Sequence, residues 1–325
     1  MGTKKKNSSR PKSFKSLAAG RPPTVQMPPK SLSRRTTKRV INGHHQLEKR
    51  RLQAVARNDK TAEMAIAAEI EALGGIARYQ QASLQGQRSD RGGDSSRVLM
   101  GWLEDLVAKA KSEAEAEGNA TAEPMRKLKL KPKLRMLEVG ALSTDNACSA
   151  SSLFDMQRID LNSQGPGILQ QDFLQRPPPQ SDNDRFDIIS LSLVLNYVPQ
   201  HSDRGVMLLR CLEFLHEPEH MSVPAGGAKK ISEISDPAIG KHFPSVFLVL
   251  PEPCVANSRY LTEEKLATIM NSLGFDLIES KTSQRLVYYL WKRVRAAPSA
   301  IPSYAKKELR AGGTRNNFSI ILQGT

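Results

Sequence analysis

Apolar residues between positions 134 and 199 form four short runs, and polar residues mark the end of each run. These polar residues are Glu138 and Gly140 in LRMLEVGALS, Asp160 in FDMQRIDLNS, Asp172 in ILQQDFLQ, and Asp187, Ser190, Ser192 and Asn196 in FDIISLSLVLNYVP. Such runs, alternating with helical stretches, predict βαβ units and an open, mostly parallel sheet. Because ligands of these sheets bind outside the carboxyl ends of the strands, we expect one polar crevice there.

The same pattern places the individual elements of the sheet. We expect strands near 134–140, 156–161, 167–171, 186–194 and 245–250, and helices near 145–154, 202–215 and 261–273. A closing pair of strands follows near 275–281 and 316–322, with 286–293 either continuing the first of them or forming a strand of its own. Residues 216–244 and 294–314 are expected to be loops or insertions.

The turn after the first strand indicates which nucleoside the crevice binds. Gly140 is followed by Ala-Leu-Ser-Thr-Asp, so the further glycines that cradle a dinucleotide pyrophosphate are missing. This disfavours an NAD-binding oxidoreductase. S-adenosylmethionine (SAM) needs only a close backbone approach, at Gly140, and an acid about twenty residues on for its ribose, where Asp160 lies. The plainer alternative is a sheet edge at which Asp160 caps the next turn.

Helical periodicity precedes the sheet, from about residue 40 onward. Asn58 or Asp59 is placed to cap a second helix, which the Gly-Gly pair at 74–75 ends, and IARYQQASLQG follows as a third segment. After the turn RGGDSS, Ser95 or Ser96 is placed to cap a longer helix. The apolar residues of that helix share one face: Leu99, Trp102, Leu103 and Val107.

The chain therefore divides into four expected parts. They are a disordered basic arm (1–39), a helical subdomain (40–118), a basic linker (119–133) and a SAM-dependent methyltransferase domain (134–325). The fold class is α/β, with a Rossmann-like class I SAM-dependent methyltransferase sheet, because a late hairpin after the last helix is typical of such sheets.

Positive charge is concentrated at the N-terminus. Of 48 Lys or Arg and 33 acids, 17 and two lie in residues 1–60, so the remaining residues carry 31 of each sign. A basic arm rich in Pro and Ser cannot bury enough apolar surface to fold. It indicates a nuclear or nucleolar address and an RNA tether acting through counterion release, with a solubilising tail as the alternative. The alternating RKLKLKPKLR fits either an RNA contact or a solvated face.

Other features narrow the class of protein. No apolar run approaches the length of a membrane-spanning helix and the N-terminus lacks the apolar core of a signal peptide, so we expect a soluble, intracellular protein with no membrane partner. The three widely spaced cysteines are expected to be small core residues: Cys148, Cys211 and Cys254. The string His-Glu-Pro-Glu-His at 216–220 matches a zinc-protease motif, but Pro218 disfavours the required helix, and we expect no metal.

Several longer strings carry a resemblance to a known family. They are GGIARYQQASLQGQRSDRGGDSSRVLMGWL, LRMLEVGALSTDN, RIDLNS, QQDFLQRP, FDIISLSLVLNYVP and LPEPCVANSRYLT. Together they resemble the fungal nucleolar methyltransferases that modify N1 of an adenine in large-subunit (25S) rRNA, over about residues 40–325. The same segments resemble the family's animal branch, a SAM sensor in nutrient signalling. The strongly basic arm favours the fungal branch.

The resemblance implies a cofactor site and a role for each matching residue. Gly140 and Asp160 would bind SAM, and Asp172 with Phe173 would hold its adenine, with Asp172 accepting from the exocyclic amine. Two further residues carried over from the family are Ser192 and Arg91, and the helical subdomain would have to fold over the pocket to bring Arg91 there.

The second substrate is expected at the ends of the fourth and fifth strands. N1 of a neutral adenine has a lone pair, so catalysis rests on alignment of an unpaired or flipped base. Asn196 is placed to bond N6 of the base and Tyr197 to stack on it. Further along lie Asn257, Arg259, suited to a phosphate, and Tyr260, suited to stacking. Packing of the tyrosines and a loop-fixing role for Asn257 and Arg259 are the plainer alternatives.

Two functions from different classes follow from these expectations. The first is a nucleolar rRNA adenine-N1 methyltransferase whose partner is the large-subunit rRNA precursor. The second is a catalytically inactive SAM-binding regulator that engages protein partners through the helical subdomain. The sequence does not indicate the oligomeric state.

Overall fold

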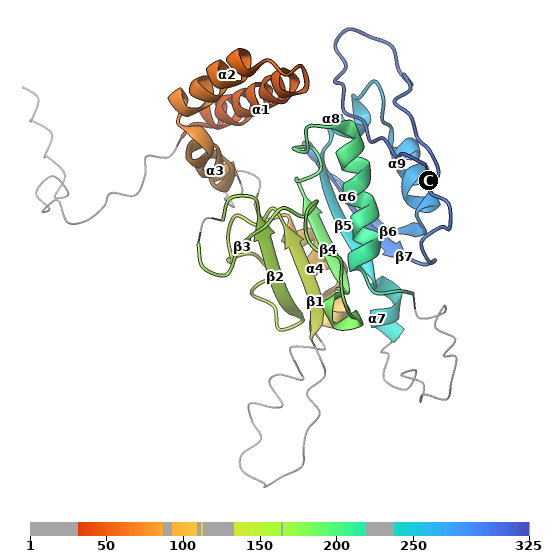
Figure 1. The fold of residues 1–325 in the computed structure, drawn as a ribbon. Coiled ribbons are helices and arrows are strands. Elements are labelled where there is room, and N and C mark those ends of the chain that lie inside the picture. Colours follow the sequence, from red (N-terminus) through yellow and green to blue (C-terminus); the bar gives the residue numbers. More distant parts are fainter. Residues whose placement is uncertain are drawn as a thin grey trace, which may run out of the picture.

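A seven-stranded sheet forms the centre of the chain in a computed structural model, which describes residues 32–86, 93–108, 112, 133–163, 165–218 and 237–324. The strand order is β3-β2-β1-β4-β5-β7-β6, parallel except for β7, which runs antiparallel between β5 and β6 (Figure 1). The strands are β1 (Leu134–Val139), β2 (Phe154–Asp160), β3 (Leu169–Gln170), β4 (Ile188–Ser192), β5 (Ser245–Pro251), β6 (Phe275–Thr282) and β7 (Leu286–Arg293).

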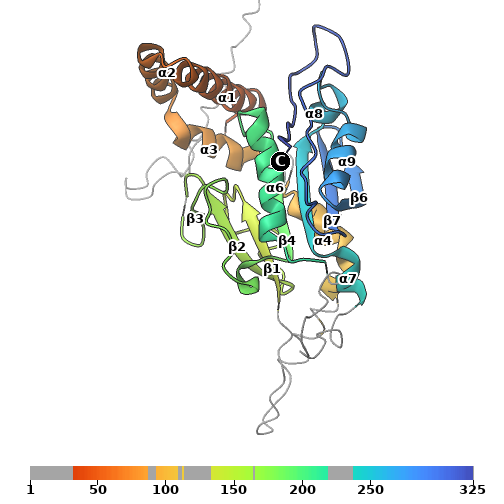
Figure 2. The ribbon, with the colours of Figure 1, turned by 45° about the vertical axis from the view of Figure 1, so that its right-hand side comes forward.

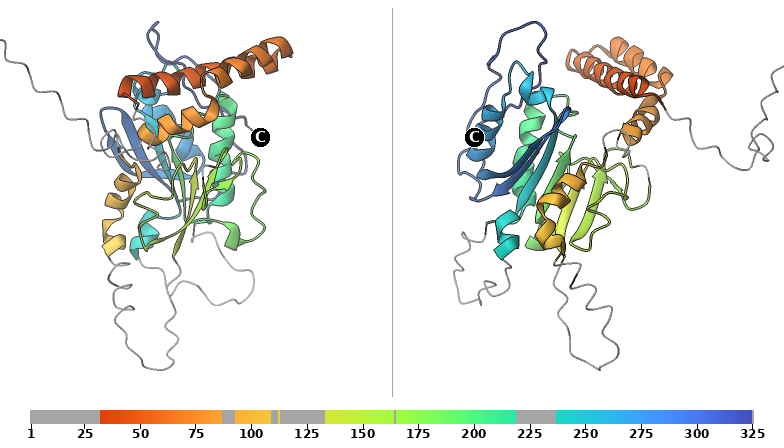
Figure 3. Two further views of the ribbon diagram at one scale, coloured as in Figure 1. Left: turned by 90° about the vertical axis from the view of Figure 1, so that its left-hand side faces the viewer. Right: turned by 180° about the vertical axis from the view of Figure 1, so that it is seen from behind.

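Helices cover both faces of this sheet. α6 (His201–Phe214) and α9 (Glu263–Ser272) lie on one face, whereas α4 (Ser96–Trp102) and α7 (Pro237–His242) contribute to the other (Figure 3). Strand β5 shows why, because its side chains alternate between the two cores: Val246, Leu248 and Leu250 join the first, and Phe247 and Val249 the second. A short helix, α8 (Pro253–Ala256), follows β5.

Three N-terminal helices lie above the carboxyl ends of the strands (Figures 1 and 2). They are α1 (Arg34–Ala56), α2 (Lys60–Ala72) and α3 (Gly75–Gly86). Asp59 caps α2 by accepting a bond from the Ala62 amide at 2.9 Å, and Gly74, at φ +98°, follows the end of that helix, as predicted. α1 and α2 share a small core of their own, which consists of Leu47, Ala54, Ile66 and Ile70.

The structure corrects where the helical part begins and which helices belong to it. α1 begins at Arg34, after the cap Ser33, so the last residues of the expected disordered arm are helical; residues 1–31 lie outside the described part. α4 was expected in the helical subdomain, yet its buried Leu99 and Leu103 pack against β-strand residues of the sheet core. Ser95 is the N-cap residue of this helix, as predicted, but its side chain makes no capping bond; Asp94 accepts a bond from the Ser96 amide at 2.9 Å instead.

The closing hairpin also differs from expectation. β6 pairs with β7, so 286–293 is a strand of its own and the predicted strand at 316–322 is wrong. Residues 316–322 form only isolated bridges, to Ser258 and Tyr304, while burying Phe318, Ile320 and Leu322 in the core. An apolar alternation therefore marked a segment that packs across the sheet domain without joining its ladder.

The helix predicted at 145–154 is absent, since turns occupy 147–150 and β2 already begins at Phe154. The helices at 202–215 and 261–273 are confirmed as α6 and α9 within one or two residues. All three cysteines are free and buried, as predicted. Among the described residues, no helix is both long enough and apolar enough to cross a bilayer.

Candidate active site

The ends of β1 and β2 meet at Gly140, the first residue after β1. Gly140 has φ +74° and its amide donates to the carbonyl of Ile159 at 2.8 Å. A Cβ at this position would lie 2.6 Å from Cγ2 of Val194, which follows β4. Both the left-handed backbone and the close packing of Val194 therefore require glycine at this position.

Asp160, at the end of β2, is held by residues from α3. Its Oδ1 accepts bonds from the Asn162 amide at 2.8 Å and from Gln80 Nε2 at 3.5 Å. Gln80 also donates to the Asn162 carbonyl at 2.7 Å and accepts from Asn162 Nδ2 at 2.8 Å, and it is almost completely buried. Burial raises the pKa of Asp160, and these two donors oppose the shift. The helical part is thus bonded directly to the predicted ribose acid.

Residues of the RGGDSS string form hydrogen bonds with the backbone of the connection from β1 to β2. Asp94 Oδ2 accepts from the Ala147 amide at 2.6 Å, and Ser96 Oγ accepts from the same amide at 3.0 Å. These acceptors, together with Asn146, which caps the Ser149 amide at 2.8 Å, satisfy the turn that replaces the predicted helix. Asp94 and Asn146 also line a cavity of about 580 Å³ beside this turn.

Glu138 and Ser192 tie this turn to the strands. Glu138 accepts two bonds of 2.9 Å from Asn146 Nδ2, and burial raises the pKa of its carboxyl. Ser192, at the end of β4, lies 2.7 Å from Ser95, hydroxyl to hydroxyl. The predicted cofactor residue Ser192 therefore contacts the turn before α4, while Arg91, four residues earlier than Ser95, lies outside the described residues.

Asp172 and Phe173 lie beside the end of β2, because the amide of Gln171 donates to the Asp160 carbonyl at 2.9 Å. Asp172 Oδ1 accepts from the Leu174 amide at 2.8 Å, which fixes the turn. Phe173 is only 2% exposed and its ring packs against Phe214 with centroids 5.6 Å apart. The Phe173 ring faces the core, so only its backbone is available to the crevice.

An aromatic cluster closes the crevice above the end of β4. Tyr197 stacks on His45 of α1 with ring centroids 4.2 Å apart, and Tyr79 of α3 packs edge-on at 6.1 Å. Two buried polar atoms beside these rings have no hydrogen-bond partner among the described residues: Asn196 Oδ1 and His45 Nε2. Burial lowers the pKa of His45 to about 4, so its ring is neutral at neutral pH. One face of Tyr197 is therefore already covered by His45.

The remaining predicted residues, 257–260, hold the C-terminal segment (residues 294–324). Arg259 donates to the Gly312 carbonyl at 2.8 Å and to Asn317 Oδ1 at 3.2 Å, and Asn257 Nδ2 lies 3.5 Å from the Thr314 carbonyl. Buried Ser258, between them, donates to the Phe318 carbonyl at 2.5 Å. These contacts favour the loop-fixing alternative for Asn257 and Arg259.

Two polar residues from the apolar runs lie away from the crevice. Asp187 precedes β4, and its Oδ2 accepts a hydrogen bond from the Arg135 amide near the start of β1. This bond lies at the amino ends of the strands, opposite the crevice. Ser190 is buried within β4. The zinc-protease string is likewise not a site here, since Glu217 pairs with Arg293 at 2.8 Å. Within the described residues no group of His, Cys, Asp and Glu is arranged to hold a metal, and His220 lies outside them.

Sequence reasoning missed the residues that close the crevice from above. These residues are Tyr79 and Gln80, in the string YQQAS, and Asp94, in the string RGGDSS. Their partners near the strand ends are 50 or more residues away in the sequence. Their hydrogen-bonding capacity was the available signal. Only the fold shows where they act.

The strand order, with an antiparallel β7 inserted between β5 and β6, and the crevice at the carboxyl ends define a Rossmann-like methyltransferase fold. Residues 64–320 match the family described as "25S rRNA (adenine(2142)-N(1))-methyltransferase, Bmt2", and the chain belongs to this family.

Named relatives agree with this assignment. The chain is 34% identical over 283 residues to the 25S rRNA adenine-N(1) methyltransferase of Schizosaccharomyces pombe, covering 87% of this chain and 90% of that protein. It is 35% identical over 256 residues to the 25S rRNA (adenine(2142)-N(1))-methyltransferase of Saccharomyces cerevisiae, covering 78% and 62%. A solved structure of the N-methyltransferase NodS from Bradyrhizobium japonicum with S-adenosyl-L-homocysteine gives a TM-score of 0.30 at 14% identity, covering 49% of this chain and 78% of NodS.

Proposed function

We propose that this protein transfers a methyl group from SAM to N1 of an adenine in 25S rRNA. The observation that carries the proposal is the family match over residues 64–320, which includes every strand end of the crevice and the helix α3 above it. The family's activity supports an enzyme over a SAM-binding regulator without catalysis.

The residues of the crevice fit SAM as the cofactor. Gly140 follows β1 with φ +74° and has no side chain that would hold a nucleoside away from the backbone. Asp160 would accept the ribose hydroxyls, and Asp172 with the Phe173 backbone would hold the adenine. When bound, SAM supplies a methyl group activated by a positively charged sulfur.

The second substrate needs orientation and not a strong base, because N1 of neutral adenine already carries a lone pair. Asn196 Oδ1 is buried without a partner, and an exocyclic amine such as N6 would supply the missing donor. Tyr197 would offer its uncovered face to the base, and His45 fixes the ring from behind. These residues would align the acceptor and exclude water, an effect worth about 7–11 kcal/mol in well-oriented systems.

The test is direct transfer to the proposed substrate. Purified protein is incubated with labelled SAM and unmodified large-subunit rRNA, and the RNA is digested to nucleosides. We expect label in 1-methyladenosine. Label in N6-methyladenosine would contradict the N1 assignment, and absence of labelled nucleoside from a preparation that binds SAM would contradict the enzyme.

We also propose a nucleolar location and a role in ribosome biogenesis, supported by the basic N-terminus. Deleting residues 1–39 removes 12 Lys or Arg and also the first turns of α1, so a second truncation ending at residue 31 separates the two effects. Fluorescently tagged protein lacking residues 1–31 should leave the nucleolus while keeping its SAM affinity. Retained nucleolar accumulation would place the address in the remaining chain.

A further inference from the structure

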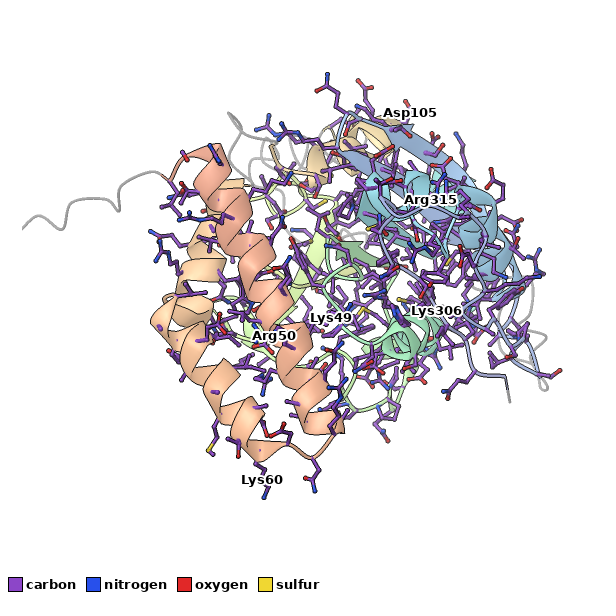
Figure 4. All side chains as sticks on the ribbon, turned by 90° about the horizontal axis from the view of Figure 1, so that it is seen from above. Lys49, Arg50, Lys60, Asp105, Lys306 and Arg315 are labelled. Atoms are coloured by element: carbon purple, nitrogen blue, oxygen red, sulfur yellow. The ribbon has the colours of Figure 1, made fainter. Side chains whose placement is uncertain are left out.

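Two basic elements face each other across the top of the molecule, on either side of the crevice. Helix α1 contains seven Lys or Arg and one acid: Arg34, Arg35, Lys38, Arg39, Lys49, Arg50, Arg51 and Glu48. Residues 301–324 contain four Lys or Arg and one acid: Lys306, Lys307, Arg310, Arg315 and Glu308. Seen from above, Lys49 of α1 and Lys306 of the C-terminal segment lie toward the space between the two parts (Figure 4).

Neutral groups hold Lys306 in place. Its Nζ lies 3.1 Å from His201 Nε2, at the start of α6, and 4.5 Å from the centroid of the Tyr260 ring. Neither contact neutralises the ammonium group. Within the part of the chain that the structure describes, no carboxylate forms an ion pair with Lys306 or with Lys49, and the neighbouring Glu48 pairs with Arg51 at 3.0 Å.

Positive charges on more than one element act on His201. Burial, the largest cause, and the nearby charges of Arg204, Lys306 and Lys49 together lower its pKa to about 4. Lys49 and Lys306, from opposite sides, therefore act on the same imidazole. Arg204 is buried and its donors are used by the carbonyls of Val198 and Ser319, so the two lysines carry the charge that remains available.

We propose that Lys49 and Lys306 together bind one backbone phosphate of the substrate RNA at the entrance of the crevice. The inference rests on the proposed function, and it identifies where the RNA backbone lies. His201 follows Tyr197 by four residues, so a phosphate bound here belongs to a nucleotide close to the base that reaches Asn196. This phosphate would bridge α1 and the C-terminal segment. It would also provide the negative charge that no described carboxylate provides to Lys49 and Lys306.

The test measures RNA binding in the full chain with both lysines changed to alanine. A protein that loses one phosphate contact loses about one unit of the slope of log affinity against log salt concentration. We expect Lys49→Ala/Lys306→Ala to show this loss, a several-fold higher KM for rRNA, and unchanged SAM affinity. The arginine pair, Lys49→Arg/Lys306→Arg, should restore the slope, since it restores both charges.

The matched control removes two exposed lysines that lie away from the crevice, Lys60 at the start of α2 and Lys241 in α7. Lys60→Ala/Lys241→Ala lowers the net charge equally, and we expect a wild-type salt slope. An equal change in both double variants would mean that general charge and not a site is responsible, and would overturn the inference. So would an unchanged slope in Lys49→Ala/Lys306→Ala. Wild-type protein that binds rRNA with a lysine-dependent slope but forms no 1-methyladenosine would count against the proposed function alone.

Discussion

The sheet domain and the N-terminal helices differ in the size of their apolar cores and in the contacts that hold them in place. In the sheet domain, alternating strand residues fill two continuous cores, and a buried segment from the C-terminus is packed across them. Helices α1 and α2 share a core of only four buried residues, and α3 adds none to it. The contacts of α1 and α3 with the sheet domain include hydrogen bonds of Gln80 to Asp160 and Asn162, and the stacked rings of His45 and Tyr197.

This difference separates folding from substrate handling. A packed apolar core gives each buried Leu, Val or Phe about 1.5–3 kcal/mol, so the sheet domain holds most of the folding free energy. The polar contacts of α1 and α3 are weaker but end on Asp160 and Tyr197, where the cofactor and the base are proposed to bind. Changes in the helices should therefore act on binding and rate, and changes in the sheet core on stability.

The largest effect is expected at Gly140. Gly140→Arg combines a left-handed backbone, which costs a non-glycine residue about 1–2 kcal/mol, with a side chain that would clash with Val194 at the proposed SAM site. Calorimetric titration should detect no SAM binding, while the far-UV spectrum stays that of a folded protein. Retained SAM affinity in this variant would place the cofactor elsewhere.

A pair of helical glycines compares the two regions directly. A Cβ at Gly205 in α6 would lie 1.9 Å from the Ile321 carbonyl oxygen, whereas a Cβ at Gly43 in α1 meets nothing within 4 Å. Gly205→Ala should destabilise the protein by about 1–3 kcal/mol through overpacking. Gly43→Ala should stabilise it by up to about 1 kcal/mol.

Chemical denaturation of both variants measures this contrast. Equal shifts in the free energy of unfolding would show that α1 and the sheet domain are equally tightly packed, and would contradict the difference between the two regions.

The pH dependence of SAM affinity sharpens the role of Asp160. Its ionised carboxylate is the form that accepts ribose hydroxyls, and burial raises its pKa above the ordinary value of 3.8. SAM affinity should therefore fall as the pH decreases through this raised pKa, beginning at a higher pH than for an exposed aspartate. Titration at a series of pH values checks this, with Asp160→Asn as the control that should show weaker and flatter binding.

The smallest effect is expected from Gln80, which touches the same carboxylate from the helical side. Gln80→Ala removes a long hydrogen bond of 3.5 Å to Asp160 and two shorter ones to Asn162. SAM affinity should weaken by about 0.5–1.5 kcal/mol, the usual net worth of a hydrogen bond. A loss as large as that of Asp160→Asn would mean that α3 is a full part of the cofactor site.

Sequence patterns predicted the centre of the sheet well because β4 and β5 are buried on both faces and read as apolar runs. They failed where residues distant in the sequence accept hydrogen bonds from the backbone or bury a segment without strand pairing. The segment 145–154 could not be recognised as a turn, since its amides are bonded by Asp94 and Ser96 from the other side of the linker. The alternation at 316–322 was misleading because Phe318 and Ile320 are buried by packing without strand pairing.

The candidate site was predictable only in part, for the same reason. Gly140 and Asp160 follow from the position of strand ends, which the sequence pattern contains. His45 and Gln80 reach the crevice from helices whose placement above the sheet depends on tertiary contacts. Local periodicity carries no information about such contacts.

The most direct test of the account is single-turnover methyl transfer to rRNA, measured beside SAM titration on the same preparations of wild type, Asn196→Ala and Tyr197→Ala. If the base binds at the end of β4, transfer should fall by tenfold or more in both variants, about 1.4 kcal/mol or more, while SAM affinity stays near that of wild type. Loss of SAM affinity in step with the rate would assign these residues to the cofactor or to folding. Undiminished transfer in both variants would contradict the placement of the reacting base in this crevice.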